Sequence, residues 1–264
     1  MIDCHTHLTA ADFDADREAV LGRAAAAGVR SIAIVGQDEA ENAAVLRAAG
    51  GRPARERPGL LAFLGLHPDR FAERGPALAD DELERICAVI RGQRARLTGI
   101  GEVGLDYWVC LGEERRELQR RAFSRMIALA LEVDLPLNVH SRSAGRPTLE
   151  ALQAAGARRV LMHAFDGRAS TALPAAEAGY VFSIPPSIVR SRQKQKLVRA
   201  LPLAALALET DSPVLGPEPG VRNEPANVAV SVRCIAEIKG VTEAEVRAVT
   251  SATAARLFGL AGPG

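Results

Sequence analysis

Short apolar runs alternate with longer amphipathic stretches along the whole chain. The runs lack a polar face, which is typical of parallel strands covered by helices outside and by packed side chains inside. Eight strand-like runs are present, at 1–5, 29–36, 60–66, 96–101, 135–140, 159–163, 179–184 and 205–210. This alternation predicts an α/β fold, a (β/α)8 TIM barrel.

The stretches between the runs have helical periodicity. In 114–131 the apolar positions are Leu118, Phe123, Ile127 and Leu131. After the eighth run we expect two more helices, one over about 226–238 and one that begins at Thr242, where Glu245 completes a capping-box signature. No linker divides the chain, so we expect a single domain over 1–264.

Composition narrows the class of protein. The chain has 264 residues, 48% of them hydrophobic, a net charge of +1 and four scattered cysteines. These values exclude an extended basic surface and give no sign of a disulfide framework or a zinc ribbon. With no apolar run of membrane-spanning length and no leader pattern, we expect a soluble, intracellular monomer in the cytoplasm or nucleus.

All five histidines and two carboxylates fall where a strand-like run ends. In a TIM barrel the carboxyl ends of the strands form the rim that carries active sites, so these residues should meet there. Singly, each has an ordinary explanation, such as a turn cap or a buried hydrogen bond; together they indicate a metal site. The set is His5, His7, His67, Glu102, His140, His163 and Asp211.

Imidazoles and carboxylates are ligands for zinc and similar divalent ions. We expect two ions, about 3.5–4 Å apart, with Glu102 bridging them. One would be held by His5, His7, Glu102 and Asp211, and the other by Glu102, His140 and His163. The imidazole-rich set favours zinc, with manganese and magnesium as alternatives.

Seven ordered motifs resemble the TatD-type metal-dependent deoxyribonucleases over the whole chain, and 138–148 and 182–188 resemble the third vertebrate branch in particular. The motifs are DCHTHL at 3–8, GLHP at 65–68, IGEVGLDY at 100–107, NVHSR at 138–142, HAFDG at 163–167, ETDSP at 209–213 and RNEP at 222–225. The resemblance implies a barrel of the amidohydrolase superfamily that cleaves DNA phosphodiesters, with DNA ends as substrate and 3′–5′ exonuclease action.

Roles follow for the residues around the metals. We expect Asp211 to act as the general base, Glu102 to act with it, and His67 to contact the phosphate or the leaving oxygen, although His67 could equally stabilise a turn. Arg142 should grip a phosphate, unless it pairs with Asp106 or Glu224. Tyr107 could stack on a base, and the matching motif adds Arg222 as a substrate contact. Glu209 would support the site from behind.

Two other functions fit parts of this pattern. An amidohydrolase or esterase that acts on a small molecule or an aminoacyl-tRNA would use the same metals to polarise a carbonyl. A barrel that only binds would not need a cluster of buried polar groups. The basic run at 190–199 could contact DNA, but such runs are usually solvated helix faces.

Overall fold

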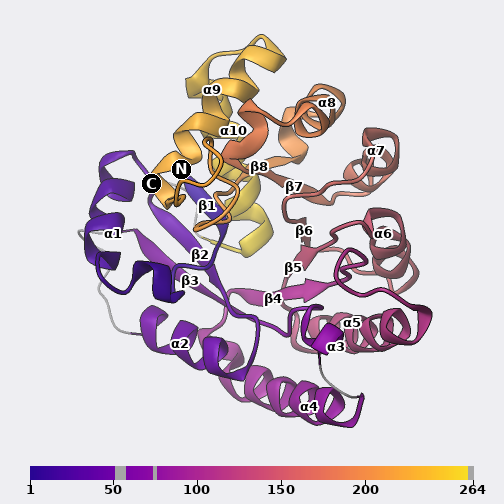
Figure 1. The fold of residues 1–264 in the computed structure, drawn as a ribbon. Coiled ribbons are helices and arrows are strands. Elements are labelled where there is room, and N and C mark those ends of the chain that lie inside the picture. The colour runs from indigo at the N-terminus through magenta and orange to yellow at the C-terminus, as the bar shows by residue number, and fades with distance from the viewer. Residues whose placement is uncertain (51–57, 74–75, 261–264) are drawn as a thin grey trace.

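The computed structural model describes residues 1–50, 58–73 and 76–260. Within these residues, eight strands form one parallel sheet whose spatial order follows the chain (Figure 1). They are β1 Ile2–Thr6, β2 Ser31–Val35, β3 Gly59–Leu64, β4 Gly99–Gly104, β5 Leu137–His140, β6 Val160–Met162, β7 Val181–Ile184 and β8 Leu206–Leu208. The predicted (β/α)8 barrel is confirmed.

Helices surround the sheet on its outer side (Figure 1). They are α1 Arg17–Ala26, α2 Glu39–Ala49, α3 Arg70–Glu73, α4 Pro76–Gln93, α5 Glu113–Val133, α6 Gly145–Ala154, α7 Ala169–Glu177, α8 Arg192–Ala200, α9 Val228–Lys239 and α10 Glu243–Phe258. The cap of α10 is confirmed, because the Thr242 hydroxyl accepts a hydrogen bond from the Glu245 amide at 3.1 Å. In α5, however, Leu131 is 50% exposed and Ala130 is buried in its place.

The sheet is closed by hydrogen bonds between β1 and the segment that follows β8. The Asp211 amide donates to the His5 carbonyl, and the His7 amide donates to the Ser212 carbonyl, both at 2.9 Å. The first and last strands are therefore side by side, although they lie about 200 residues apart in the chain. Closure brings His5 and His7 next to Asp211.

The interior of the barrel is apolar at the end where the strands begin. Ile2 and Val181, the first residues of β1 and β7, belong to one buried cluster with Phe63 and Phe258. The rings of Phe63 and Phe258 meet edge to face with centroids 5.1 Å apart. The end of α10 thus packs against the starts of the strands, which leaves the opposite rim for polar side chains.

Among the helices within the described ranges, none combines the length and the hydrophobicity needed to cross a lipid bilayer.

Candidate metal centre

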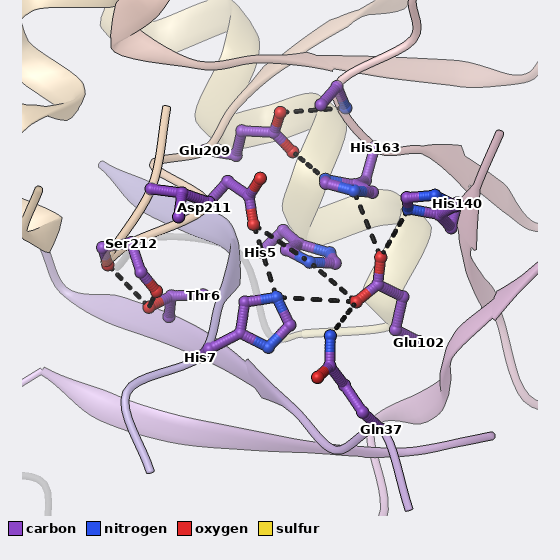
Figure 2. Close-up of polar contacts among 12 residues, drawn as sticks. His5, Thr6, His7, Gln37, Glu102, His140, His163, Glu209, Asp211 and Ser212 are labelled. Carbon is purple, nitrogen blue, oxygen red and sulfur yellow. Dashed lines mark hydrogen bonds and ion pairs between the residues drawn. The ribbon is translucent and has the colours of Figure 1, made fainter. Parts of the chain in front are cut away.

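Glu102 lies at the centre of a ring of side chains that come from the carboxyl ends of the strands (Figure 2). It belongs to β4 and is buried. Burial alone would raise the pKa of its carboxyl, but interactions with the surrounding histidines, His67 first among them, outweigh burial and hold this pKa well below its usual value. Glu102 is therefore a buried carboxylate that stays ionised because imidazoles surround it.

One oxygen of Glu102 faces His5 of β1 and His7, which follows this strand. Its Oε2 atom lies 3.6 Å from His5 Nε2 and 3.5 Å from His7 Nε2. Asp211 Oδ1 lies 3.6 Å and 3.4 Å from the same two nitrogens. Two imidazoles and two carboxylates thus converge on one point, as predicted for the first metal position.

The other oxygen of Glu102 faces a second group of histidines. Its Oε1 atom lies 2.9 Å from His140 Nδ1, 3.3 Å from His163 Nε2 and 3.4 Å from His67 Nε2. His140 and His163 are the predicted ligands of the second ion, whereas His67 was predicted to contact substrate. His67, Glu102 and His140 also offer ligand atoms close enough together to hold an ion.

A divalent cation fits the donor atoms of this cluster. His5 is fully buried, yet its Nε2 atom has no hydrogen-bond partner. The nitrogen faces Glu102 and Asp211 at 3.6 Å, which is too long for a hydrogen bond. An orphaned imidazole nitrogen that faces two carboxylates is the arrangement expected around a cation.

Asn138 fixes the ring of His5 in this orientation. The Asn138 amide donates to the Cys4 carbonyl at 2.8 Å, so its oxygen is turned toward His5 Nδ1, also at 2.8 Å. When Nδ1 donates a hydrogen bond to that oxygen, the neutral imidazole has no proton on Nε2, which is then free to bind a cation. Sequence reasoning quoted Asn138 only as part of a motif and gave it no role.

Glu209, which was expected to support the site from behind, contacts the far side of the His163 ring. Its Oε2 atom lies 3.3 Å from His163 Nδ1 and accepts a hydrogen bond from the Ser183 hydroxyl at 2.6 Å. Its Oε1 atom accepts from the Ala164 amide at 2.9 Å. Each Glu209 oxygen therefore has a partner, and the imidazole presents Nε2 to the centre.

Asp106 does the same for His140, a role that the sequence did not reveal. Its Oδ2 atom lies 2.9 Å from His140 Nε2, and its Oδ1 atom accepts from the amides of Trp108 and Val109. Burial opposes ionisation of Asp106, but its contact with His140 lowers the pKa of the carboxyl. The loop after β4 is thereby coupled to the histidine cluster.

The cluster opens into a cavity of about 470 Å³, a size typical of small-ligand pockets. The residues that line it outside the predicted ligands and His67 include Gln37, Ser141, Arg142, Ala164, Asp166 and Lys194. The Arg142 guanidinium lies 5.1 Å from the centre of the exposed Trp108 ring. Arg142 forms no ion pair within the described residues. Of the two carboxylates that were considered as its partners, Asp106 contacts His140 and Glu224 pairs with Arg23.

Two of the predicted substrate contacts lie outside the cavity lining. The Tyr107 hydroxyl accepts a hydrogen bond from Arg120 at 3.2 Å. Arg222 donates to both carboxylate oxygens of Asp16 at 2.8 and 2.7 Å and lies over the ring of Phe13. The structure therefore places Arg142 and His67 at the cavity but directs Tyr107 and Arg222 toward helix residues and the first loop.

Known proteins resemble this chain over almost its full length. The family model described as TatD related DNase matches residues 2–259. The human protein named deoxyribonuclease TATDN3 is 46% identical over 265 residues, which cover 98% of this chain and 94% of that protein. A Bacillus subtilis protein named as the metal-dependent hydrolase YabD is 34% identical over 267 residues, 98% of each chain.

A solved structure shows the same architecture. The crystal structure of YjjV, a TatD homologue from Escherichia coli, superposes with a TM-score of 0.87 at 28% sequence identity. The match covers 99% of this chain and 98% of that one.

Proposed function

The chain belongs to the TatD-related DNase family of metal-dependent hydrolases, and from this premise we propose that it hydrolyses phosphodiester bonds in DNA at a binuclear metal centre. One observation carries the proposal: the two oxygens of buried Glu102 face two separate groups of imidazoles. A carboxylate in that position can bridge two cations.

The residues that would hold the metals are those predicted for each position. Glu102 would join His5, His7 and Asp211 on one side and His140 and His163 on the other. When bound, divalent ions supply Lewis-acid stabilisation of the phosphate oxygens and lower the pKa of water. The high proportion of imidazole nitrogen favours zinc or manganese over magnesium.

Three side chains would act on the substrate. Asp211 would orient the attacking water and accept its proton; its carboxyl is held in the ionised form that this role needs, because His163 and His7 lower its pKa in spite of burial. Arg142 would bind a phosphate oxygen, since its guanidinium lines the cavity and lacks a carboxylate partner among the described residues. His67 would donate a hydrogen bond to the leaving oxygen.

The protonation of His67 suits that last role. Burial disfavours the imidazolium, but the charge of Glu102 and the contact with Asp69 raise its pKa to about 10. His67 Nδ1 lies 2.8 Å from Asp69 Oδ1, which leaves Nε2 directed toward the centre. A proton donor therefore lies beside the place where negative charge develops on the leaving group.

We propose that the substrate is a DNA end and that digestion runs from the 3′ end. A cavity of about 470 Å³ accommodates a terminal nucleotide and not a length of duplex. The lining cations Arg142 and Lys194 favour a phosphate over the uncharged carbonyl of an amidohydrolase or esterase substrate.

Cleavage of end-labelled oligonucleotides tests this function. Protein stripped of metal is supplied with zinc, manganese or magnesium and given single strands blocked at the 3′ or the 5′ end, with an aminoacyl ester as the competing substrate. We expect cleavage that a 3′ block abolishes, and a loss of at least about 10³-fold in kcat for Asp211→Asn. Ester hydrolysis without DNA cleavage would overturn the proposal in favour of the acyl hydrolase.

A further inference from the structure

One lysine of the basic segment 190–199 differs from its neighbours. Lys194 lies in α8 and is only 7% exposed, whereas Lys196 and Arg199 of the same helix are exposed. Its side chain lines the same cavity as Arg142 and the histidine cluster. The other basic residues of the segment are exposed to solvent, as is usual for such runs, but Lys194 is turned inward.

The ammonium group of Lys194 interacts with carboxylates only at a distance, those of Glu209, Asp166 and Asp211. Its Nζ atom donates to the carbonyls of Ala164 at 2.9 Å and Phe165 at 3.5 Å, and no carboxylate among the described residues forms an ion pair with it. Asp166, which lines the cavity too, accepts a hydrogen bond from the Ser143 amide. A buried cation with only carbonyl partners is poorly compensated, and an anion in the cavity would complete its environment.

The contacts of Lys194 with the loop after β6 do not by themselves explain a charged residue there. Gln193 already holds this loop through hydrogen bonds from Nε2 to the carbonyls of Phe165 at 3.2 Å and Gly167 at 2.7 Å. The neutral side chain of Gln193 thus stabilises the same loop, although Gln193 does not line the cavity. A lysine adds a positive charge next to the metal centre.

We propose that Lys194 is a phosphate-binding residue of this site, which together with Arg142 holds the non-bridging oxygens of the substrate phosphate. Arg142 follows β5, whereas Lys194 comes from the helix after β7, so the two cations reach the cavity from different elements. The inference rests on the proposed function, because it assigns this residue to recognition of the same phosphate.

Calorimetric titration of the metal-loaded protein with inorganic phosphate tests the inference without DNA cleavage. Lys194→Met should weaken phosphate binding by about tenfold or more, the loss expected for a charge-assisted hydrogen bond. Lys194→Arg should retain most of the affinity. Lys196→Met removes an exposed charge from the same helix, and Gln193→Ala removes the neutral brace, so both should bind phosphate within about twofold of the original protein.

Kinetics on an oligonucleotide supply the second measurement. We expect Lys194→Met to raise KM and to reduce the salt dependence of binding, because one phosphate contact is lost. Unchanged phosphate affinity in Lys194→Met, or an equal loss in Lys194→Met and Gln193→Ala, would show that Lys194 is only a brace and would overturn the inference. Should Lys194→Met fail to fold, Lys194→Gln replaces it under the same criteria. The two proposals can fail separately. If the protein does not cleave DNA but still binds phosphate through Lys194, the proposed nuclease activity is refuted and the phosphate site is retained.

Discussion

At the scale of single residues, the candidate centre depends on side chains that hold the proposed metal ligands in place. Asn138 and Glu209 each accept a hydrogen bond from the far nitrogen of an imidazole, so that the near nitrogen of His5 or His163 faces Glu102. Such partners determine the tautomer and the angle of the ring, and their loss commonly costs 10- to 100-fold in metal affinity, in order of magnitude.

Asn138→Ala should therefore weaken metal binding by about 10- to 100-fold. The substitution removes the acceptor for His5 Nδ1, which frees the ring to rotate and to change tautomer. Competition with a chromogenic chelator measures the affinity. Asn42→Ala is the matched control, because Asn42 is also buried and bonds both polar groups of the Gly65 backbone without contacting a predicted ligand. Equal metal affinity in the two variants would refute the orienting role of Asn138.

His67 should make the stability of the metal-free protein depend on alkaline pH. Its pKa rises from 6.5 to about 10 on folding. A raised pKa stabilises the fold fully below the unfolded value of 6.5 and loses that contribution as the pH rises toward 10. Urea unfolding in the presence of a chelator at pH 6.5, 8 and 9.5 should show a falling free energy of unfolding. The decline should be shallower in His67→Gln; parallel declines would contradict the proposed pairing with Glu102.

At the scale of elements, β4 positions the centre because it packs unusually close to its neighbours. A Cβ atom on Gly101 would lie 2.6 Å from the Cβ of Asn138, and one on Gly104 would lie 2.0 Å from the carbonyl oxygen of His140. Only glycine permits these approaches. The glycines thus set the distance between Glu102 on β4 and the residues of β5.

Gly104→Ala should consequently cost about 3 kcal/mol or more and disturb the metal centre. The new methyl group would clash with His140 in addition to straining a backbone φ of +147°. Gly112→Ala separates the two effects, since Gly112 has a φ of +110° but open space around the position of its Cβ. We expect that control to lose only about 1–2 kcal/mol and to keep its metal content. Denaturant unfolding and elemental analysis provide the two measurements.

The elements, and the gathering of the candidate ligands at one rim, were predictable from the sequence, whereas the contacts that support these side chains were not. Continuous apolar runs predict the strands, and period-3.6 patterns predict the helices. The rule that active sites lie at the carboxyl ends of barrel strands brings together residues such as His5 and Asp211 without any knowledge of distance. The role of Asn138 depends on its contacts with His5 and Cys4 of β1, a strand that is not paired with β5, and no local pattern encodes such contacts. Lys194 was hidden because its orientation depends on how α8 rotates against the barrel, and a run of basic residues has the same appearance on either face.

At the scale of the whole molecule, the two ends of the barrel have separate tasks. The polar cluster occupies the carboxyl ends of the strands, and the apolar cluster with α10 occupies their starts. Strand β1 reaches both ends, because it supplies Ile2 to the apolar end and His5 to the polar cluster. Its hydrogen bonds with the segment after β8 close the barrel between these two ends. Stability and chemistry should therefore respond to different substitutions.

Phe258→Ala tests this division at the apolar end. Phe258 is buried against Phe63, and its truncation should lower the free energy of unfolding by about 3–5 kcal/mol through lost burial and a residual cavity. Leu260→Ala is the milder control, because Leu260 is only partly buried against the same cluster. Urea denaturation gives the stability, while metal content and kcat at a temperature well below the transition report on the centre. We expect both to be unchanged in Phe258→Ala; a variant that stays folded but loses its metals would show that the apolar end holds the rim in shape as well as holding the barrel together.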